Sequence, residues 1–300
     1  QGTEHVSRIN IKFTRFSAFY TPLLATAAGG FLKDEGLEPH LAICEEGKSA
    51  IDALLDGSAH VGQSAPAQGL GSLEKGEAPK AVHFAQINER DGFFLTGRAP
   101  EPDFSWAGLA GKKVIVTHGP QPLAMFKYAC KSQGLDYGAI DAIDAGKGPA
   151  MDALFRSGEG DYIHQQGAAP QQLAADGVGH VVASVGQAFG PCAFSSLAAT
   201  REWLETDMAL AFMRAYRKTR AWINEAPAAE IAAAEKEWFP KIDKAVLADC
   251  IGFYQTLGCW APHVEITRAA FDVTLDVFRN VGRDHPSSVY DAIVAPPPGE

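Results

Sequence analysis

The chain has 300 residues, of which 46% are hydrophobic and 21% charged, and its formal net charge is -10 at pH 7. This length is enough for one large or two medium domains with a full hydrophobic core. The acidic balance argues against a nucleic-acid surface and a polybasic membrane contact, since both need clustered lysine and arginine. No stretch approaches 18 uninterrupted apolar residues, so no membrane span is predicted.

The five cysteines are scattered, with no C-x-x-C pattern and no histidines at zinc-ligand spacing. We therefore expect small buried hydrophobic side chains at these positions, and neither a metal site nor a cofactor. The chain begins at Gln1, and we expect a processed mature form whose signal peptide has been removed. The cysteines are Cys44, Cys130, Cys192, Cys250 and Cys259.

Strand-like and helix-like segments alternate through the first hundred residues, which is the rhythm of a mainly parallel sheet covered by helices. Proline in a first turn and glycine just past a last turn mark several helix ends. The predicted strands are 6–13, 37–44, 59–63, 81–86 and 92–98, and the predicted helices are 22–34, 48–56 and 66–75.

The rhythm stops at the prolines after Gly97 and restarts at residue 112, which predicts a second α/β unit. Its predicted strands are 112–117, 139–144, 161–165 and 179–185, and its predicted helices are 120–133, 148–157 and 170–176. After the segment "GQAFGPCAFSSLAAT" the pattern becomes all helical, with helices expected over 201–224, 227–238, 243–257 and 264–281.

Five motifs in a fixed order carry a resemblance to a known family, from about residue 9 to residue 281. "FYTPLLATAAGGFLKDEGLEPHL" and "AIDALLDGSAHVGQSAP" come first, followed by "LAGKKVIVTHG" and "AMDALFRSGEGDYIHQQGAAPQQL". The last is "AYRKTRAWINEAP". Together they resemble the sulfonate, nitrate, taurine and thiamine-precursor binding proteins of ABC importers.

The resemblance implies an α/β, two-lobed type II periplasmic binding protein with an all-helical carboxyl-terminal part. We expect lobe 1 to comprise residues 1–97 and 198–300, and lobe 2 residues 98–197. The predicted hinge lies at the prolines near Gly97 and at the return segment 186–191. Such a protein closes its lobes on a solute and is not an enzyme. Its partners would be the solute and an ABC permease, with no nucleic acid and the membrane reached only through the permease. We expect a periplasmic monomer.

In open α/β sheets ligands bind beyond the carboxyl ends of strands, where helix amino termini present free N–H groups. Arg15 there could pair with a carboxylate or sulfonate, or form an ion pair at the hinge. The hydroxyls could cap helices, and the histidines could be structural. The candidate ligand-binding residues are Arg15, Phe16, Ser17, Phe19, Tyr20, Ser49, Gln63, Ser64, Asn88, Thr117, His118, Gln121, Tyr162, His164 and Gln165.

Two ligand classes fit this polar and aromatic set. The first is a small organic anion such as a sulfonate or carboxylate, with an apolar or aromatic body. The second is a neutral heteroaromatic ring such as a thiamine-precursor pyrimidine. Enzyme signatures are incomplete, because "GQSAP" lacks the second glycine of a nucleophile elbow. The pyrimidine synthase of fungal thiamine biosynthesis, a relative with a clustered "CCCFC" motif, is disfavoured because no cysteines cluster here.

Overall fold

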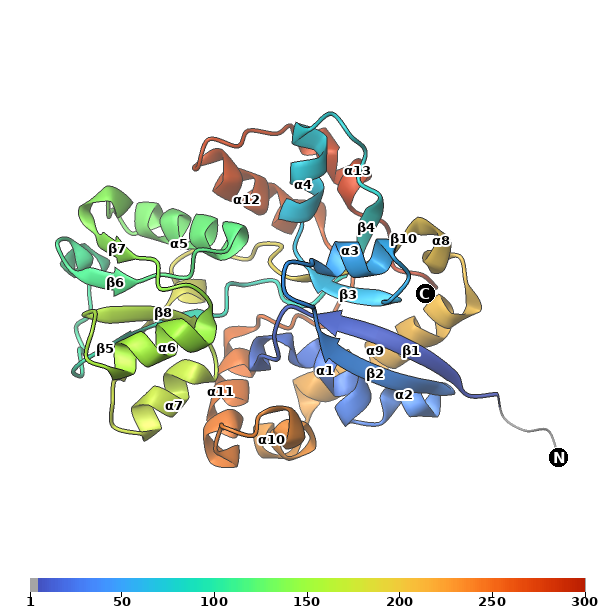
Figure 1. Ribbon diagram of the computed structural model, residues 1–300, viewed down its shortest axis with the longest axis horizontal. Helices are drawn as coiled ribbons and strands as arrows, with labels where there is room; N and C mark the ends of the chain where they lie inside the picture. Colours follow the sequence, from blue (N-terminus) through green and yellow to red (C-terminus); the bar gives the residue numbers. More distant parts are fainter. Residues whose placement is uncertain (1–4, 300) are drawn as a thin grey trace.

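The computed structural model describes residues 5–299 as two α/β lobes, each built on a five-stranded sheet (Figure 1). The first sheet has the order β2 (Leu37–Ile43), β1 (Ser7–Phe13), β3 (Val61–Ser64), β10 (Ser196–Thr200) and β4 (Ala81–Gln86). The second has the order β7 (Asp141–Ile143), β6 (Lys113–Ile115), β8 (Tyr162–Gln166), β5 (Phe93–Gly97) and β9 (His180–Ser184).

The two sheets share one pairing plan. In the first sheet β1 is parallel to β2 and β3, while β10 runs antiparallel between β3 and β4. In the second, β6 is parallel to β7 and β8, while β5 runs antiparallel between β8 and β9. Each sheet is therefore built on three parallel strands and contains one antiparallel strand, which is β10 in the first sheet and β5 in the second. The predicted two-lobed α/β fold is confirmed.

Helices cover both sheets as the alternating pattern predicts. The first lobe carries α1 (Thr21–Ala28), α2 (Phe31–Asp34), α3 (Ala50–Leu55) and α4 (Ala67–Glu74), and the second carries α5 (Pro120–Ser132), α6 (Gly148–Arg156) and α7 (Ala169–Ala175). The carboxyl-terminal helices are α8 (Arg201–Leu204), α9 (Asp207–Glu225), α10 (Ala228–Glu235), α11 (Lys244–Leu257), α12 (Arg268–Arg279) and α13 (Tyr290–Ile293). No helix within residues 5–299 is both long and apolar enough to cross a bilayer.

Several element boundaries differ from those predicted. The helix expected over 22–34 is broken at Gly29–Gly30, where Gly30 has a φ of 80° that favours glycine. The helix expected over 201–224 is divided, because Thr206 caps a new helix with its side chain. The helix expected from 264 begins at Arg268, after the cap Thr267. The strand β10 was not predicted at all.

The two lobes are joined by two crossovers, residues 87–92 and 185–195. Because β5 belongs to the second sheet, the first crossover precedes it, whereas the predicted boundary and hinge followed it at Gly97 and its prolines. The crossovers are bonded to each other, since Ile87 N donates to the Ser195 carbonyl at 2.9 Å and Cys192 N to the Glu89 carbonyl at 2.7 Å. The return segment predicted at 186–191 does lie within the second crossover.

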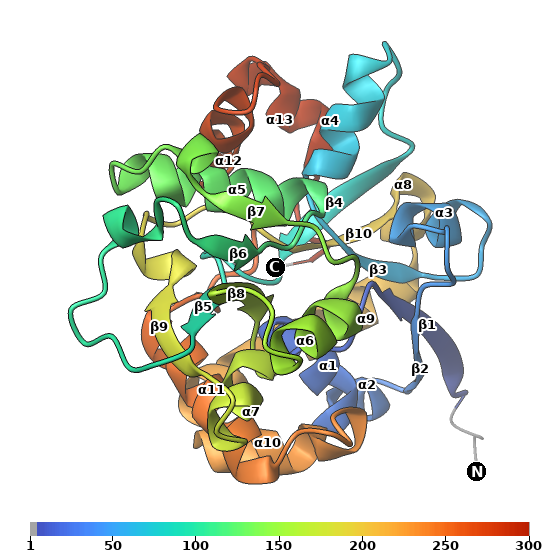
Figure 2. The same ribbon diagram turned by 60° about the vertical axis from the view of Figure 1, so that its left-hand side comes forward.

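The helix α11 lies against both lobes, beside α10 of the first and α7 of the second (Figures 1 and 2). Its Tyr254 hydroxyl donates to the carbonyl of Gly92 at 2.6 Å and accepts from the N–H of Gly167 at 2.9 Å. At its amino terminus, the N–H of Asp243 donates to the Gln172 side chain at 3.0 Å. The carboxyl-terminal helices are therefore packed on the second lobe as well as on the first, to which the predicted boundaries assign them.

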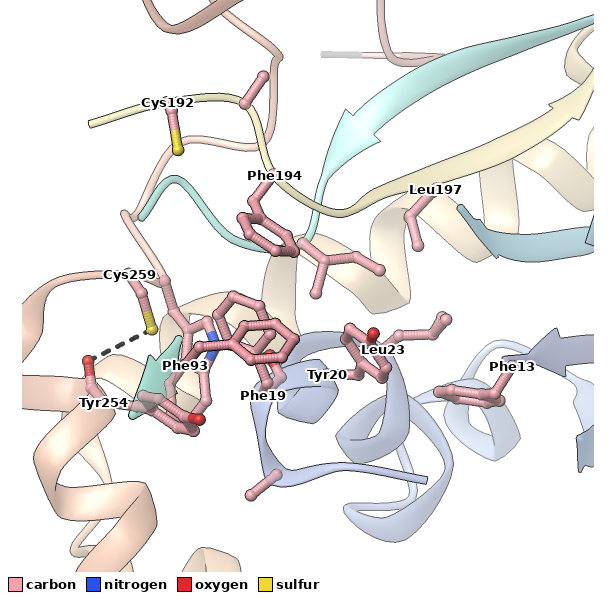
Figure 3. Close-up of a cluster of buried hydrophobic side chains, with 14 of the residues drawn as sticks. Phe13, Phe19, Tyr20, Leu23, Phe93, Cys192, Phe194, Leu197, Tyr254 and Cys259 are labelled. Carbon is pink, nitrogen blue, oxygen red and sulfur yellow. Dashed lines mark hydrogen bonds between the residues drawn. The ribbon is translucent and has the colours of Figure 1, made fainter. Parts of the chain in front are cut away.

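An aromatic cluster fills the space beside the crossovers (Figure 3). The Phe19 ring lies 5.3 Å from the Phe194 ring and 5.5 Å from the Tyr254 ring, and the Phe93 ring lies 6.0 Å from that of Phe194. The first lobe contributes Phe19, β5 of the second lobe Phe93, the second crossover Phe194 and α11 Tyr254. Burying such rings stabilises the fold by roughly 1.5–3 kcal/mol for each side chain. The cluster therefore holds the lobes, the second crossover and α11 together.

Candidate functional site

The carboxyl ends of the parallel strands of the two lobes meet across a short distance. Ser17, after β1, donates its hydroxyl to the carbonyl of Gly167, after β8, at 3.0 Å. Gln166 donates its side-chain N–H to the Tyr20 hydroxyl at 3.1 Å. Gln121, at the start of α5, donates to the Phe194 carbonyl of the return crossover at 2.7 Å. The first two contacts join the two lobes directly, and the third joins the second lobe to the return crossover.

The long segment after β1 supplies the first-lobe side of this junction. Ser17 caps a short 3-10 helix, η1 (Ala18–Tyr20), by accepting from the N–H of Phe19, and Phe19 is fully buried in the aromatic cluster. Phe16 is half-buried, with its ring 5.3 Å from that of Phe13. Ser17 therefore has the capping role that the sequence allows, and both Ser17 and Tyr20 also contact the second lobe; their contact with a ligand stays a prediction.

Arg15 reaches toward the second lobe. Its Nη1 lies 3.7 Å from the space that a side chain on Gly148 would fill, and Gly148 is the first residue of α6. The half-buried guanidinium makes no ion pair or side-chain hydrogen bond with residues 5–299, so the alternative of a hinge ion pair is not found. A cation beside the positive end of a helix dipole creates a local site for an anion in an otherwise acidic protein.

Four buried polar side chains from both lobes lie at the inner part of the junction. Each has one side-chain atom that is buried and makes no hydrogen bond with residues 5–299. These atoms are Ser64 Oγ, Gln121 Oε1, His164 Nε2 and Gln166 Oε1. Buried polar atoms normally have partners, and leaving one unpaired costs about 1–3 kcal/mol. Ser64 ends β3 in the first lobe and Gln166 ends β8 in the second, so each lobe offers an unpaired polar atom at a strand end, where a ligand could bind it.

His164 has a defined protonation state. Its Nδ1 accepts from the backbone N–H of Thr117 at 3.2 Å, so the proton of the neutral ring is on Nε2. The ring is stacked on Phe93 at 4.5 Å and lies 4.6 Å from Phe126. Burial, with a smaller contribution from His118, lowers the pKa of His164 to about 3. Thr117 also donates its hydroxyl to the His164 carbonyl, so its role is to orient this ring.

Of the other lobe-two candidates, His118 lies nearer the surface and Gln165 is buried on the opposite face of β8. His118 is partly exposed, with Nδ1 2.6 Å from the Val116 carbonyl and 3.8 Å from Asp144. Gln165 points to the other face of its strand and donates to Asp152 of α6 at 3.0 Å. On lobe one, Gln63 accepts from the backbone N–H and hydroxyl of Thr14, and so holds the segment that carries Arg15.

Ser49 and Tyr162 are placed away from the junction of strand ends, whereas Asn88 lies beside it and donates to the Phe19 carbonyl at 3.4 Å. Ser49 caps α3 in a reciprocal capping box with Asp52. Asn88 is buried in the first crossover, where it accepts from the N–H of Ser195 at 2.8 Å. Tyr162 begins β8 and donates its hydroxyl to Glu101 at 2.8 Å, at the far end of the strand. Conversely, Phe93 and Phe194 line the junction but were not among the candidates, because neither ends a predicted strand.

A surface hollow of about 780 Å³ lies elsewhere, around the β1–β2 edge, with Arg8, Lys12 and His40 in its lining. First-lobe residues line it, together with Glu237 and Trp238 of the 3-10 helix η5 (Lys236–Trp238) between α10 and α11. It has no residue from the second lobe and none of the unpaired buried atoms. The polar junction between the lobes is therefore the better candidate site.

Asp91, in the first crossover, is a buried carboxyl whose titration should affect stability. Burial raises the pKa of Asp91 to about 7, although the N–H of Phe93 opposes this by donating to Oδ1 at 2.7 Å. A carboxyl with a raised pKa contributes stability below about pH 4 that is lost as the pH rises toward 7. We expect Asp91→Asn to be as stable as the parent at pH 4 and about 1–3 kcal/mol more stable at pH 8.

Urea unfolding of both proteins between pH 4 and 8 measures this effect. Buried Glu235, whose pKa is also raised by burial, titrates in both proteins and cancels in the difference. A pH-independent difference would show that Asp91 is not the titrating group.

The two lobes have the same strand pairing, are joined by two crossovers and meet at polar strand ends. This arrangement is the periplasmic binding protein fold. The chain belongs to the NMT1/THI5-like family, whose model matches residues 18–230. Among curated proteins it is 26% identical over 263 residues to the Bacillus subtilis (strain 168) protein named "Putative binding protein YtlA", covering 86% of this chain and 79% of that protein.

Solved structures share the fold at low sequence identity. The alkanesulfonate-binding protein SsuA from Xanthomonas axonopodis pv. citri, bound to MOPS, is 14% identical with a TM-score of 0.73, over 96% of this chain and 99% of that chain. The periplasmic nitrate-binding protein NrtA from Synechocystis PCC 6803 is 16% identical with a TM-score of 0.74, over 96% and 86%. The desulfurization enzyme DSZB also has this fold, at 13% identity and a TM-score of 0.66, over 97% and 96%.

Proposed function

We propose that this protein is the extracytoplasmic solute-binding component of an ABC importer. It captures a small organic anion, a sulfonate or carboxylate with an apolar or aromatic body, and delivers it to a membrane permease. The observation that carries the anion is Arg15, a guanidinium that lies beside the amino terminus of α6 and has no carboxylate partner within residues 5–299. The names of the sulfonate- and nitrate-binding structures support the same class of ligand.

The mechanism is closure of two lobes on the solute. A ligand that contacts both lobes favours the closed form by its difference in affinity for the two forms. Arg15 and Tyr20 approach from the first lobe, and the α6 amino terminus and Gln166 from the second, so one small molecule can contact both sets. We propose that the protein works as a periplasmic monomer.

A binding role is favoured over thiolate catalysis by the state of the cysteines. All five are free, and four are fully buried. Burial raises the pKa of the Cys192, Cys250 and Cys259 thiols, so the reactive thiolate is disfavoured. The uncharged lining of the inner junction favours a second candidate ligand, a neutral heteroaromatic ring.

A thermal-shift screen of alkyl and aryl sulfonates, aromatic carboxylates, nitrate, bicarbonate, pyrimidines and flavins tests the proposal. A ligand at 100 times its dissociation constant stabilises the folded state by about 2.7 kcal/mol. Small-angle scattering with the best ligand should show a form at least as compact as the free protein. If only neutral rings stabilise the protein, the anion is wrong and the second candidate replaces it.

Arg15→Gln is expected to weaken binding of the anionic ligand by about 10- to 100-fold, since charged hydrogen bonds contribute about 1.5–3 kcal/mol. Titration calorimetry measures this. The matched control is Arg8→Gln on β1, the strand before Arg15, because Arg8 is exposed and its side chain bonds only Asn10 within residues 5–299. An equal loss for Arg8→Gln, or an unchanged affinity for Arg15→Gln, would remove Arg15 from the site.

A further inference from the structure

The end of β8 is held between the first lobe and α11. Gly167, the residue after β8, accepts from the Ser17 hydroxyl at 3.0 Å and donates its N–H to the Tyr254 hydroxyl at 2.9 Å. Gln166, the last residue of β8, donates to the Tyr20 hydroxyl at 3.1 Å. All three hydrogen bonds are buried. Ser17 and Tyr20 thus bind the second lobe from the first, and Tyr254 binds it from α11.

Gly167 packs tightly in this position. A Cβ there would lie 2.9 Å from the Tyr254 hydroxyl oxygen and 3.1 Å from Gln171 Oε1, and it would lie closer still to Cys250 Sγ on α11. The φ of Gly167 is not positive, so the position depends on the missing side chain and not on backbone freedom. The backbone of the second lobe is therefore in direct contact with α11.

The helix α11 is packed on first-lobe helices as well. It lies beside α10, and Gln255 donates to the carbonyls of Ile223 and Ala226 at the end of α9, both at 2.9 Å. In turn, α9 packs on α1 and α2 of the first lobe. The residues that hold the end of β8 are therefore all carried by the first lobe or by a helix packed on it. If the two lobes separate at this point, the buried hydrogen bonds have to break.

We propose that the turn at Gln166 and Gly167, with Ser17, Tyr20 and Tyr254, is a clasp that holds the two lobes together without solute and so controls solute entry. Every group in the clasp is part of the protein, so the same contacts stabilise the joined lobes in the free and the loaded protein alike. This deepens the proposed function by naming a regulation of its site, and it rests on that function.

The clasp affects the rates of binding and leaves the affinity nearly unchanged. A solute between joined lobes enters and leaves only while the lobes are apart. Because one hydrogen bond changes an equilibrium by about 2- to 10-fold, each clasp contact lowers the association and dissociation rates by the same factor. The dissociation constant is the ratio of the two rates, so it changes little while the joined form predominates. A residue that acts on the solute would instead change mainly the dissociation rate.

Small-angle scattering of the extensively dialysed, solute-free protein tests the clasp directly. The parent is expected to give the radius of gyration calculated from this structure. The double variant Ser17→Ala/Tyr20→Phe is expected to be larger by about 0.5–1 Å, on roughly 19 Å for a compact chain of this length. The control is Ser49→Ala/Tyr290→Phe, which removes the same groups from the cap of α3 and from a contact with the Ile266 carbonyl.

Gly167→Ala tests the effect on rates, since its methyl group meets Cys250 and Tyr254 only while the lobes are joined. The probe is benzenesulfonate, followed by stopped-flow tryptophan fluorescence. Both rate constants are expected to rise by about 2- to 10-fold, with the dissociation constant changed by less than about twofold. Gly108→Ala is the control, because Gly108 is exposed on the second lobe and a Cβ there meets nothing within 4 Å.

Each outcome bears on the clasp or on the proposed function. A free parent larger than this structure, or a double variant that does not expand, overturns the clasp and leaves the proposed function intact. A rise in the dissociation rate alone for Gly167→Ala also overturns it. If Gly167→Ala fails to fold, the scattering of the parent and the double variant decides. If benzenesulfonate does not bind while the scattering is as expected, the clasp is supported and the anion of the proposed function loses support.

Discussion

Arg220→Met is expected to lower the free energy of unfolding by about 2 kcal/mol or more, because the Ile87 and Ala261 carbonyls lose the donor while Gln86 keeps Tyr216, and a buried acceptor left without a partner costs about 1–3 kcal/mol. Arg220 is fully buried on α9, where Nη1 donates to the carbonyls of Gln86 and Ile87 at 3.2 and 3.0 Å. Its Nε donates to the carbonyl of Ala261. Gln86 and Ile87 are the end of β4 and the start of the first crossover, so one side chain fixes the position where the chain leaves the first lobe.

Urea denaturation of the parent and variant measures the loss. The control is Arg214→Met on the same helix, where Arg214 is exposed and pairs with Glu35 at 2.9 Å. A surface pair of this kind contributes about 0–1 kcal/mol. A neutral or stabilising Arg220→Met would mean that burying the guanidinium costs more than its three carbonyl contacts return.

The sequence predicts the outer plan of the fold because local signals mark it. Alternating segments, helix-terminal glycines and first-turn prolines place most strands and helices of both lobes near their observed positions. The strand β10 has no such signal. Its residues Ser196–Thr200 are mostly small, and it is defined only by pairing with β3 and β4, more than a hundred residues away in sequence. Long-range pairing of this kind has no local pattern.

The same limit explains what could be predicted of the site. Polar residues after parallel strands are expected at one edge, and Gln121 and His164 lie there. Alternation puts Tyr162 and His164 on one face of β8, but it does not predict how far along the strand a side chain lies from the site. Tyr162 lies at the opposite end of β8, near Glu101. Phe194 lies in the crossover leading to β10, so its place beside the site could not be predicted before that strand was known.

The lobe boundary shows a related physical limit. A strand such as β5, which is fully buried and apolar, fits either of two adjacent sheets. Which sheet β5 joins depends on the direction of the chain after residue 86. Hydrogen bonds from Arg220 and between the two crossovers fix that direction. The prolines that follow Gly97 come directly after the end of β5.

Gly186→Ala is expected to destabilise the protein by about 2–3 kcal/mol, which is a typical cost of overpacking a filled site. A Cβ on Gly186 would lie 2.1 Å from the backbone oxygen of Asp91 and 3.1 Å from Leu257 Cδ2. Asp91 is in the first crossover and Gly186 in the second, so the added methyl group forces the two crossovers apart. Because a backbone oxygen is the nearest atom, a side-chain rotation cannot relieve the contact. Urea denaturation measures the loss, and calorimetry measures ligand affinity, which should fall as the lobes lose their closed geometry.

Gly71→Ala is the matched control, since Gly71 lies in α4 and a Cβ there meets nothing within 4 Å. Alanine should be neutral or stabilise that helix by up to about 1 kcal/mol. If Gly186→Ala were equally well tolerated, the crossovers would be able to separate at little cost, and their mutual hydrogen bonds would not define the hinge. A loss of stability with unchanged ligand affinity would instead show that the crossovers support the fold without setting the closed geometry. A parallel loss of both would establish the contact between Gly186 and Asp91 as the point about which the two lobes are held.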